Sequence, residues 1–573
     1  MQLGEIHRRV LPMLQMDIVS CLPMEIGLHV FSYLSVDTLL AASLVDRQWN
    51  RLANDQGLWR GLCHANKWEW RTPYQDTLDR RTVQIPSNPQ APAVDEGFGD
   101  DEPENDASGS AVVLSMANPP DTKPSVDETS TDSAFSARRL VLRHSSPAVL
   151  LSNPKLPCRP DYKALYRTRT ILRRRLRTSN YRLTTLHDPI HTPLNGGTDH
   201  RGGHTSTIYS LCLASDPRTS EPTLYTASRD QRILQWNLSS PAHSRSSPTK
   251  VFQGVHVGSV LSICVSATHG FLISGGSDGQ IVIWSLRTAL PVKVLEGRDG
   301  HYDSVLCVRC DEERVVSCSK DRTLRIYDLL SLKPLHTLRS HRAAVNSLAL
   351  SNSLIVSASG DRSLRLWDAE TGDLLRIFEG HHTRGLASID FSMPHIVTGS
   401  SDRQIRLFDL CTHRGWSTDP WRHQAQPLSF PESHVDMTGL YSAAANAQFS
   451  ALIAAARVQA GLSGAETGGG IAGDVCELCG GDRRVMPPEN RVHLDLVRAV
   501  VMDEDVVVSA SYDSTIKVWD KKTGALLSDL VSGHTGRIFG VAFDCTKIVS
   551  CGEDARICIW DFSFGLDTAF VKL

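Results

Sequence analysis

The pattern of apolar and polar positions between residues 341 and 378 predicts four short strands joined by turns. Apolar and β-branched residues dominate Val345 to Leu350, Leu354 to Ser359, Ser363 to Trp367 and Leu374 to Phe378, and each run has the length of a strand. Turn-forming residues such as Ser-Asn-Ser and Gly-Asp-Arg separate the runs. We therefore expect one four-stranded sheet from a unit of about 40 residues.

The same pattern recurs through the C-terminal two-thirds of the chain. In each copy an aromatic residue lies in the third run, an Asp stands six positions before it, and a His precedes both. The aromatic residues are Trp236, Trp284, Tyr327, Trp367, Phe408, Trp519 and Trp560. The Asp residues are Asp230, Asp278, Asp321, Asp361, Asp402, Asp513 and Asp554. The His residues are His204, His256, His301, His341, His381, His493 and His534. Seven copies predict a repeat architecture.

The His, the turn Asp, a strand Ser and the Trp are expected to form one buried hydrogen-bonded group in each copy. A buried polar network is stable only when every member has a partner, which explains why these residue types occur together. We therefore assign the histidines to the framework rather than to metal binding or catalysis.

These units resemble WD repeats, and seven of them imply a mainly β fold, a seven-bladed β-propeller covering about Leu183 to Asp561. Asn237 and Ser285 depart from the family by replacing the terminal Asp. A closed ring leaves no exposed sheet edge, but the last unit supplies three strands before the chain nearly ends. The missing strand is either Leu183 to Leu186 or the tail Phe570 to Leu573.

Residues 20 to 63 carry a helical pattern instead. Pro23 favours a helix start, and apolar residues follow it at helical spacing. Ser35 and Asp46 open two further short helices. About 45 residues arranged in this way cannot bury so much apolar surface among themselves. The excess predicts a docking face.

This stretch resembles an F-box, although Asp46 stands where that family more often has a small residue or Cys. In the family the apolar helical face binds the Skp adaptor of a cullin–RING ubiquitin ligase. The resemblance implies that the adaptor is bound by Leu22, Pro23, Glu25, Ile26, Val30, Phe31, Leu34, Leu39, Leu44, Val45, Trp49, Leu58 and Trp59. A small self-contained helical bundle is the alternative interpretation.

The remaining segments complete the predicted organisation. We expect an N-terminal tail at 1–16, the F-box at 17–70, a disordered linker rich in Pro, Ser and acidic residues at 71–160, and a basic helix at 161–182. The propeller takes 183–573 and contains an insertion at 411–490 between the fifth and sixth repeats. The basic helix is interpreted as a spacer between the two modules, with a nuclear import signal or a nucleic-acid contact as alternatives.

The insertion holds Cys476 and Cys479, which resemble half of a zinc site. A closed zinc site needs four ligands, and no second pair lies nearby. His493 already belongs to a repeat. We therefore predict neither a metal nor a cofactor.

Composition excludes several classes of protein. A formal net charge of -3 gives no overall reason to expect nucleic-acid binding, and 14 scattered cysteines suit a reducing compartment. No apolar run has the length of a membrane span, and the N-terminus lacks a signal-peptide core. We expect an intracellular protein of the cytoplasm, the nucleus or both. The chain has no P-loop, GxSxG or HExxH motif, so we do not expect an enzyme.

Propellers usually bind partners on the face that carries the His-containing loops. In the closed ring, blades six, seven and one are neighbours and would bring arginines close to aromatic residues, an arrangement suited to a phosphate or carboxylate. Arg229 and Arg498 match arginines that read phosphorylated degrons in F-box/WD-repeat proteins, whereas Glu553 would oppose an anion. A phosphodegron, an acidic or unphosphorylated peptide, and a surface without a binding pocket all remain open. The predicted substrate-binding residues are Tyr209, Arg229, Lys320, Arg498, Tyr512, Arg537 and Phe539.

The favoured function is that of a substrate receptor in an SCF-type ubiquitin ligase, which brings a bound client close to the ubiquitin-transfer machinery. Two alternatives belong to other classes. One is a scaffold that acts without ubiquitination, and the other is a nucleic-acid or chromatin binder that uses the basic helix.

Overall fold

The computed structural model describes residues 17–71, 160–187, 202–216, 221–238, 247–351, 353–412, 415–418, 443–459, 492–568 and 570–571. The predicted tail at 1–16 and the linker at 71–160 lie outside these residues almost entirely. All helices and strands from α2 to β28 belong to one compact unit. Among the described helices, none is both long enough and apolar enough to cross a bilayer.

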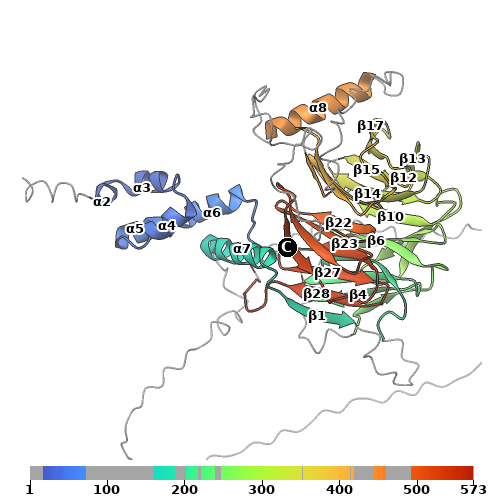
Figure 1. The fold of residues 1–573 in the computed structure, drawn as a ribbon, viewed down its shortest axis with the longest axis horizontal. Helices are drawn as coiled ribbons and strands as arrows, with labels where there is room; N and C mark the ends of the chain where they lie inside the picture. The colour runs from blue at the N-terminus through green and yellow to red at the C-terminus, as the bar shows by residue number, and fades with distance from the viewer. Residues whose placement is uncertain are drawn as a thin grey trace, which may run out of the picture. The chain divides into compact units, whose positions relative to one another are not determined.

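Seven four-stranded sheets make up most of the described chain (Figure 1). Blade one is β2 (Ile208–Ser215), β3 (Pro222–Ser228), β4 (Ile233–Asn237) and β5 (Lys250–Phe252). Blade two is β6 (Val260–Ser266), β7 (Phe271–Gly276), β8 (Ile281–Ser285) and β9 (Pro291–Leu295). Blade three is β10 (Val305–Cys310), β11 (Arg314–Ser319), β12 (Thr323–Asp328) and β13 (Pro334–Arg339). Blade four is β14 (Val345–Ser351), β15 (Leu354–Ser359), β16 (Leu364–Asp368) and β17 (Leu374–Phe378).

The last three blades follow the same plan. Blade five is β18 (Leu386–Ser392), β19 (His395–Ser400), β20 (Ile405–Asp409) and β21 (Gly415–Ser417). Blade six is β22 (Val497–Met502), β23 (Val506–Ser511), β24 (Ile516–Asp520) and β25 (Leu526–Leu530). Blade seven is β26 (Ile538–Phe543), β27 (Lys547–Gly552), β28 (Ile557–Asp561) and β1 (Arg182–His187). The first strand of each blade contacts the first strand of the next, and β26 contacts β2, so the predicted seven-bladed propeller is confirmed.

Strand β1 closes the ring. It pairs antiparallel with β28, with Leu183 opposite Trp560. The competing candidate, the C-terminal tail, pairs elsewhere, because Val571 forms an isolated bridge with Trp70. The last blade is therefore built from both ends of the propeller segment, so that separating the ends of the ring requires breaking a sheet.

The core of the ring lies between neighbouring blades. The second strands of blades three, four and six are buried at every position. Strands that are buried on both faces carry nearly continuous apolar runs, which accounts for sequences such as VVVSAS in β23. Each apolar cluster takes side chains from two successive blades, so neighbouring blades depend on each other for burial.

The helical region consists of α2 (Ile18–Cys21), α3 (Met24–Phe31), α4 (Val36–Ala42), α5 (Arg47–Ala53) and α6 (Gln56–Ala65). Ser35 accepts a hydrogen bond from the backbone of Thr38 at the start of α4. Asp46 accepts from the backbone of Gln48 and Trp49 at the start of α5. The helix starts expected from the sequence at Pro23, Ser35 and Asp46 are thus present.

Helix α7 (Tyr162–Arg177) contacts both modules. Its N-terminal half packs Leu165 against Cys63 of α6, while Leu172 enters the apolar cluster of blades six and seven. Burial raises the pKa of the Cys63 thiol to about 11, as expected inside an apolar contact. Arg173 pairs with Asp505, and Arg175 donates to the backbone oxygens of Phe562 and Phe564 at 2.7 and 2.8 Å.

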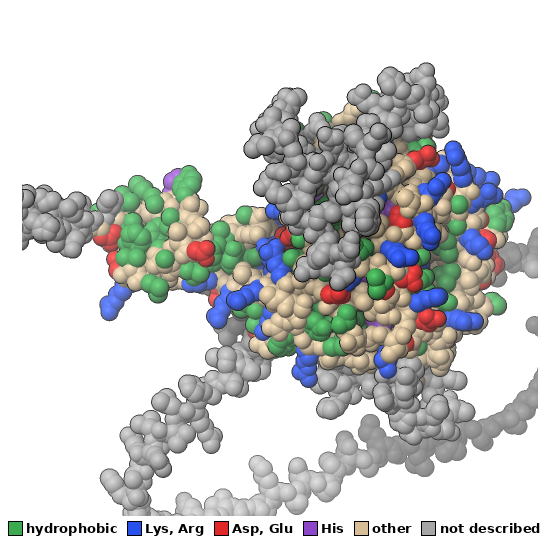
Figure 2. Space-filling model, viewed as in Figure 1, with side chains coloured by type: hydrophobic (Ala, Val, Ile, Leu, Met, Phe, Trp, Pro, Cys, Tyr) green, Lys and Arg blue, Asp and Glu red, His purple; other side chains and the backbone are tan. Residues whose placement is uncertain are grey.

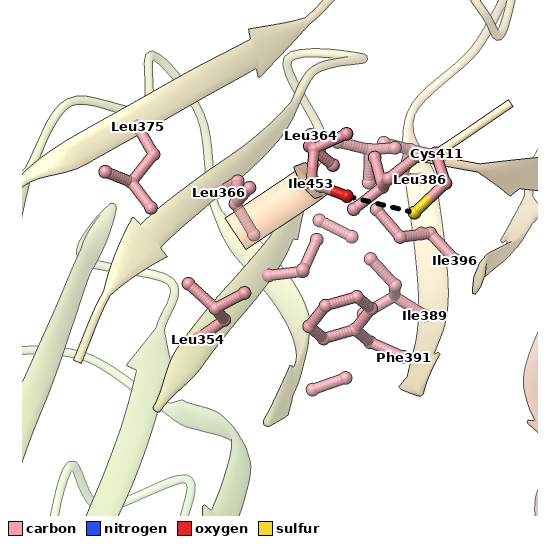
Figure 3. Close-up of a cluster of buried hydrophobic side chains, with 14 residues drawn as sticks. Leu354, Leu364, Leu366, Leu375, Leu386, Ile389, Phe391, Ile396, Cys411 and Ile453 are labelled. Carbon is pink, nitrogen blue, oxygen red and sulfur yellow. Dashed lines mark hydrogen bonds between the residues drawn. The ribbon is translucent and has the colours of Figure 1, made fainter. Parts of the chain in front are cut away.

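The insertion contributes a further helix, α8 (Ala443–Gln459), which contacts β17 of blade four. Ile453 enters the apolar cluster formed by blades four and five, and its backbone oxygen lies 4.0 Å from the Cys411 sulfur (Figure 3). Arg376 stacks over the Phe449 ring at 4.6 Å. The part of the insertion that contains α8 therefore covers the junction between blades four and five.

Candidate functional site

Exposed apolar side chains gather on the helical region (Figure 2). Leu44 is 85% exposed and Val45 61%, and both lie just after α4. Ile26 and Val30 of α3 are 49% and 43% exposed. Large apolar groups left in water in one small region mark an interaction surface. We call the set Met24, Ile26, Val30, Tyr33, Leu40, Leu44 and Val45 the helical apolar face.

Three of the residues predicted to bind the adaptor are buried. Phe31, Leu39 and Trp59 are almost completely buried, at 1, 2 and 2% exposure. Phe31 packs edge-on against Trp49, whose indole nitrogen donates to Asp17. Phe31 and Leu39 pack the short helices together, while Trp59 donates to the Ala53 backbone oxygen and packs against Tyr166 of α7. Their contact with an adaptor stays a prediction. Leu22, Leu34, Trp49 and Leu58 are half-buried, while Pro23 and Glu25 are exposed.

Sequence reasoning missed three members of the helical apolar face, namely Met24, Tyr33 and Leu40. Tyr33 is 78% exposed and contacts His29 on the preceding turn. Met24 and Leu40 lie next to predicted residues in the chain, yet the apolar pattern alone does not say which side of a short helix faces the core.

We call the end of the ring that carries the framework histidines and Asp turns the His face. In every blade a His Nδ1 lies 2.9–3.0 Å from the turn Asp, and its Nε2 lies 2.6–2.9 Å from a Ser or Thr hydroxyl. Because an ionised carboxylate only accepts, Nδ1–H donates to the Asp and Nε2 accepts from the hydroxyl. The framework role of the histidines is consistent with this geometry.

The fifth framework His is His382, so the expected His381 was wrong. His382 lies 2.9 Å from Asp402 and 2.8 Å from Thr398. His381 instead packs against the Phe408 ring, with centroids 4.6 Å apart. Both histidines stand at a distance from Asp402 in the sequence that suits a framework residue. The path of the loop before β18 decides which of the two bonds to Asp402.

The Trp completes the buried group in four blades. There its indole nitrogen donates to the same hydroxyl that the His uses, at 2.8–3.0 Å, for Trp236, Trp284, Trp367 and Trp519. In blade three, Tyr327 donates to the Asp299 backbone oxygen instead, and the Phe408 ring of blade five has no donor. The Trp560 indole nitrogen is buried without a partner among the described residues. The four-membered group is thus a majority pattern rather than a rule for every blade.

Burial and charge keep these groups in fixed ionisation states. Burial alone would raise the pKa of Asp402, but the hydrogen bond from His382 and backbone donors lower it to about 2. Burial lowers the pKa of His493, against the opposing effect of Asp513. Such groups are paired, enclosed and structural, which argues against a catalytic use.

The structure brings four predicted substrate-binding residues together on the His face. Phe539 packs edge-on against Tyr209 and Tyr512, with ring centroids 5.2 and 5.4 Å apart. The Arg537 guanidinium lies over the Tyr512 ring at 5.3 Å. Blades one, six and seven thus supply one aromatic cluster with a cation at its edge, as their positions in the closed ring predict.

The other predicted residues lie outside this cluster. Arg229 is exposed and its backbone nitrogen donates to the backbone oxygen of Thr207, two residues before Tyr209 in the chain. Arg498 is half-buried and its charge acts on the Cys551 thiol. Lys320 belongs to blade three, where its amine is 3.9 Å from Asp303. Glu553, expected to oppose an anion, is exposed and its backbone nitrogen donates to the Arg537 oxygen.

Within the described residues, no group of three or more His, Cys, Asp or Glu side chains is arranged to hold a metal. Cys476 and Cys479 lie outside those residues.

Comparison with protein families identifies both modules. An F-box-like model matches residues 19–65. The model of the WD domain, G-beta repeat, matches residues 491–520 and 525–561, and a model of the nucleolar protein 10-like N-terminal domain matches residues 208–391. The chain combines an F-box-like domain with a WD-repeat propeller. An F-box/WD protein of this kind typically lacks catalytic activity of its own.

Curated relatives of this F-box/WD protein are distant. Cell division control protein 4 of Saccharomyces cerevisiae is 27% identical over 270 residues, 46% of this chain and 28% of the relative. The probable E3 ubiquitin ligase complex SCF subunit sconB of Penicillium rubens is 26% identical over 180 residues, 30% of this chain and 26% of the relative. Striatin of Mus musculus is 35% identical over 130 residues, 20% of this chain and 16% of the relative. The chain thus spans less than a third of the length of each of these relatives.

Among solved structures, the WD40 β-propeller domain of Doa1 matches at 17% sequence identity with a TM-score of 0.44. The match covers 63% of this chain and 94% of that structure.

Proposed function

We propose that this F-box/WD protein is the substrate receptor of an SCF-type ubiquitin ligase. Its helical apolar face binds a Skp-type adaptor, and its His face binds a client protein. The observation that carries the proposal is the exposure of seven large apolar side chains on α3, α4 and the turns that follow these two helices, of which Leu44 and Tyr33 are 85% and 78% exposed. Such a surface is costly in water and suits a protein partner.

The curated relatives support the same function. Sequence similarity extends to a protein described as a probable SCF subunit. The receptor itself performs no chemistry in this scheme. It raises the rate of ubiquitin transfer by holding the client near the transfer machinery, which converts an encounter into a nearly intramolecular step.

The aromatic cluster of Tyr209, Tyr512 and Phe539 is the proposed contact site for the client. An apolar client residue would pack against the rings, and an anionic client group, for example a phosphorylated residue, would pair with Arg537. Arg229 and Arg498 would add positive charge around this position.

The nucleic-acid alternative loses its main support. Arg173 and Arg175 of α7 bind Asp505 and backbone oxygens of the propeller, and Arg177 lies 3.6 Å from Asp520. Their charges are used within the protein. The helix fits the spacer interpretation, in which it fixes the F-box-like domain to the ring.

The test is adaptor binding by the full chain carrying Leu44→Asp. Leu44 is so exposed that the change leaves the fold intact, yet it places a charge in the proposed contact. We expect the affinity for a purified Skp adaptor to fall about thirtyfold or more in titration calorimetry, a loss typical of residues that dominate an interface.

Leu290→Asp is the matched control, because Leu290 is an exposed leucine at 64% on the propeller. This control should bind like the unmodified chain. If the unmodified chain fails to bind at micromolar concentration while folded, or if both variants bind equally well, the proposal is wrong. In cells, a client whose turnover is unchanged by Leu44→Asp would instead favour the scaffold function.

A further inference from the structure

Several cysteines lie close together on the strands of blades one, two and three. Cys212, Cys264, Cys307 and Cys310 belong to β2, β6 and β10, the first strands of these blades, and Cys318 belongs to β11. The first strands of successive blades contact each other round the ring and therefore line its middle. All these cysteines are free thiols. None of them belongs to the helical apolar face or to the aromatic cluster.

The Cys264 side chain points toward blade three. The hydroxyl of Ser262 in β6 accepts a hydrogen bond from the Val308 backbone nitrogen of blade three at 3.1 Å, so Ser262 points that way. Residues two apart in a regular strand lie on the same side. The pairing of β6 with β7 is regular from Ser262 onward, and the Cys264 sulfur therefore leaves the strand on the side of blade three.

The Cys310 side chain points back toward blade two. Cys307, in the same strand, points toward blade four, because its sulfur lies 3.8 Å from the Leu348 backbone oxygen. The pairing of β10 with β11 is regular from Cys307 onward, and an interval of three residues reverses the direction of the side chain. Cys264 and Cys310 accordingly contribute to the same apolar cluster between blades two and three.

The two sulfurs are neighbours. Strands β6 and β10 run in the same direction, because each is the first strand of its blade, and Ser262 lies beside Val308. Two residues further along each strand, Cys264 lies beside Cys310. Burial raises the pKa of the Cys264 thiol well above its usual value, and a hydrogen bond with the Cys310 sulfur raises it further. Small rotations of the two side chains are enough to bring such sulfurs to bonding distance.

The two thiols differ in their access to solvent. Cys264 is 6% exposed, whereas Cys310 is half-buried. The neighbouring Arg309 is exposed, and its positive charge acts on Cys264 against the effect of burial on the thiol pKa. Cysteines that react with oxidants are accessible, lie near positive charge and have a second thiol beside them. Cys310 therefore suits the attacking thiol, and Cys264 suits the thiol that resolves the product.

We propose that Cys264 and Cys310 form a modification site at which hydrogen peroxide joins them in a reversible disulfide. The Cys310 thiolate attacks one oxygen of the peroxide, and the O–O bond breaks. The second oxygen leaves as hydroxide and takes up a proton, so that Cys310 becomes a sulfenic acid and one water is released.

The second step forms the disulfide. The Cys264 sulfur attacks the Cys310 sulfur, the S–S bond forms and the S–O bond breaks. Hydroxide leaves and takes up the Cys264 proton to become a second water. Two thiols are thus oxidised to one disulfide, and one peroxide is reduced to two waters. A small thiol such as glutathione reverses the reaction by exchange.

The disulfide links blade two to blade three through their first strands. These strands belong to different sheets, so the link closes a long loop of the unfolded chain. Closing such a loop restricts the unfolded state, and the oxidised propeller becomes more resistant to unfolding. This inference does not depend on the proposed function, because it concerns the ring alone.

Other cysteines of the same strands provide internal controls. Cys307 and Cys318 lie opposite each other on β10 and β11, but they are only 6% and 0% exposed. We expect them to stay reduced, because peroxide does not reach either sulfur. Cys212 is half-buried like Cys310, but its sulfur lies at the Val265 backbone of blade two instead of beside a thiol that faces it.

The test uses the full chain, first reduced and then treated with hydrogen peroxide at neutral pH. An alkylating reagent blocks the remaining thiols, and mass spectrometry of protease fragments maps the disulfides. The variant is Cys310→Ser, and the matched control is Cys212→Ser, which removes another half-buried thiol from a first strand. Unfolding in denaturant is measured for each chain before and after oxidation.

We expect fragments joined through Cys264 and Cys310 that separate again in dithiothreitol. Oxidation should raise the denaturant midpoint of the unmodified chain and of Cys212→Ser alike, and leave that of Cys310→Ser unchanged. The inference is overturned if Cys264 remains a thiol, if it is joined to a cysteine other than Cys310, or if oxidation raises the midpoint of Cys310→Ser as much as that of the unmodified chain. The fragment map of the unmodified chain decides the question even where a variant folds poorly.

Discussion

At the scale of single residues, His381 and His382 show how little separates a framework residue from a packing residue. Both have a His side chain at compatible spacing from Asp402, yet His382 alone lies within hydrogen-bond distance of Asp402 and Thr398. Its ring is buried, so removing it leaves a carboxylate and a hydroxyl without their partner. Groups left unsatisfied in this way weaken a fold more than the loss of an ordinary contact.

We predict that His382→Ala lowers the free energy of unfolding by about 3 kcal/mol, because it leaves buried polar groups unpaired. His381→Ala should lower the free energy of unfolding by only roughly 1 kcal/mol, because it removes a single ring contact with Phe408. Denaturant unfolding of the two variants measures the difference. Equal losses would show that the blade does not distinguish the two histidines.

At the scale of elements, two helices outside the blades hold parts of the chain together. Helix α7 buries Leu165 against α6 and Leu172 against blades six and seven, and its arginines bind propeller groups. Helix α8 buries Ile453 between blades four and five. The opposite side of α8 is exposed, with Val458 at 73%. Phe449, Leu452 and Ala456 pack beside Ile453 against the same cluster, and Ile453 is the most deeply buried of the four, so a charge at Ile453 should disrupt the whole contact.

We predict that Ile453→Asp releases α8 from the ring, because a carboxylate cannot be buried in an apolar cluster without a partner. Hydrogen exchange of residues 443–459 should become faster, while exchange in the strands of blades one, six and seven stays unchanged. Val458→Asp, on the exposed side, should leave α8 protected. Unchanged exchange in the Ile453→Asp variant would mean that α8 does not depend on this contact.

At the scale of the whole molecule, the ring repeats one ionisation pattern. Burial opposes ionisation of the framework Asp residues, but the hydrogen bonds and charge of the histidines together with backbone donors, and for Asp230 also the charge of Arg232, lower the pKa of Asp230 and Asp402 to about 2. The pKa values of Asp278, Asp321, Asp361, Asp513 and Asp554 are lowered for the same reasons. Burial also lowers the pKa of His341 and His493. All these groups bind protons less readily in the folded state.

A depressed folded-state pKa contributes stability that is complete above the unfolded value and is lost as the pH falls. The free energy of unfolding should therefore begin to decline below about pH 6.5, where unfolded histidines protonate, and more steeply below about pH 4. We expect a loss of about 3 to 5 kcal/mol between pH 7 and pH 3.5, measured by denaturant unfolding. Asp402→Asn should show a shallower decline below about pH 4. A stability independent of pH over this range would contradict the prediction.

Much of the fold could be predicted from the sequence, because the repeat is defined by patterns within short stretches of the chain. Strand length, turn residues and the six-residue interval from Asp to aromatic residue are enough to predict seven blades, and the cap at Asp46 lies where the sequence indicates. Helix and strand periods place residues on faces without reference to the rest of the chain. The aromatic cluster could also be predicted, because closure of the ring makes blades six, seven and one neighbours.

Only the tertiary structure decided matters that depend on distant segments. In the structure β1, and not the C-terminal tail, closes the ring, and His382, and not His381, bonds to Asp402. Arg173 and Arg175 bind groups of the propeller instead of pointing into solvent. The tertiary structure also placed Phe31 and Trp59 in the helical core and left Leu44 in water. A local pattern states which residues are apolar or charged. Whether such a residue finds a partner depends on which other surface the fold brings to it, and that is a property of the whole chain.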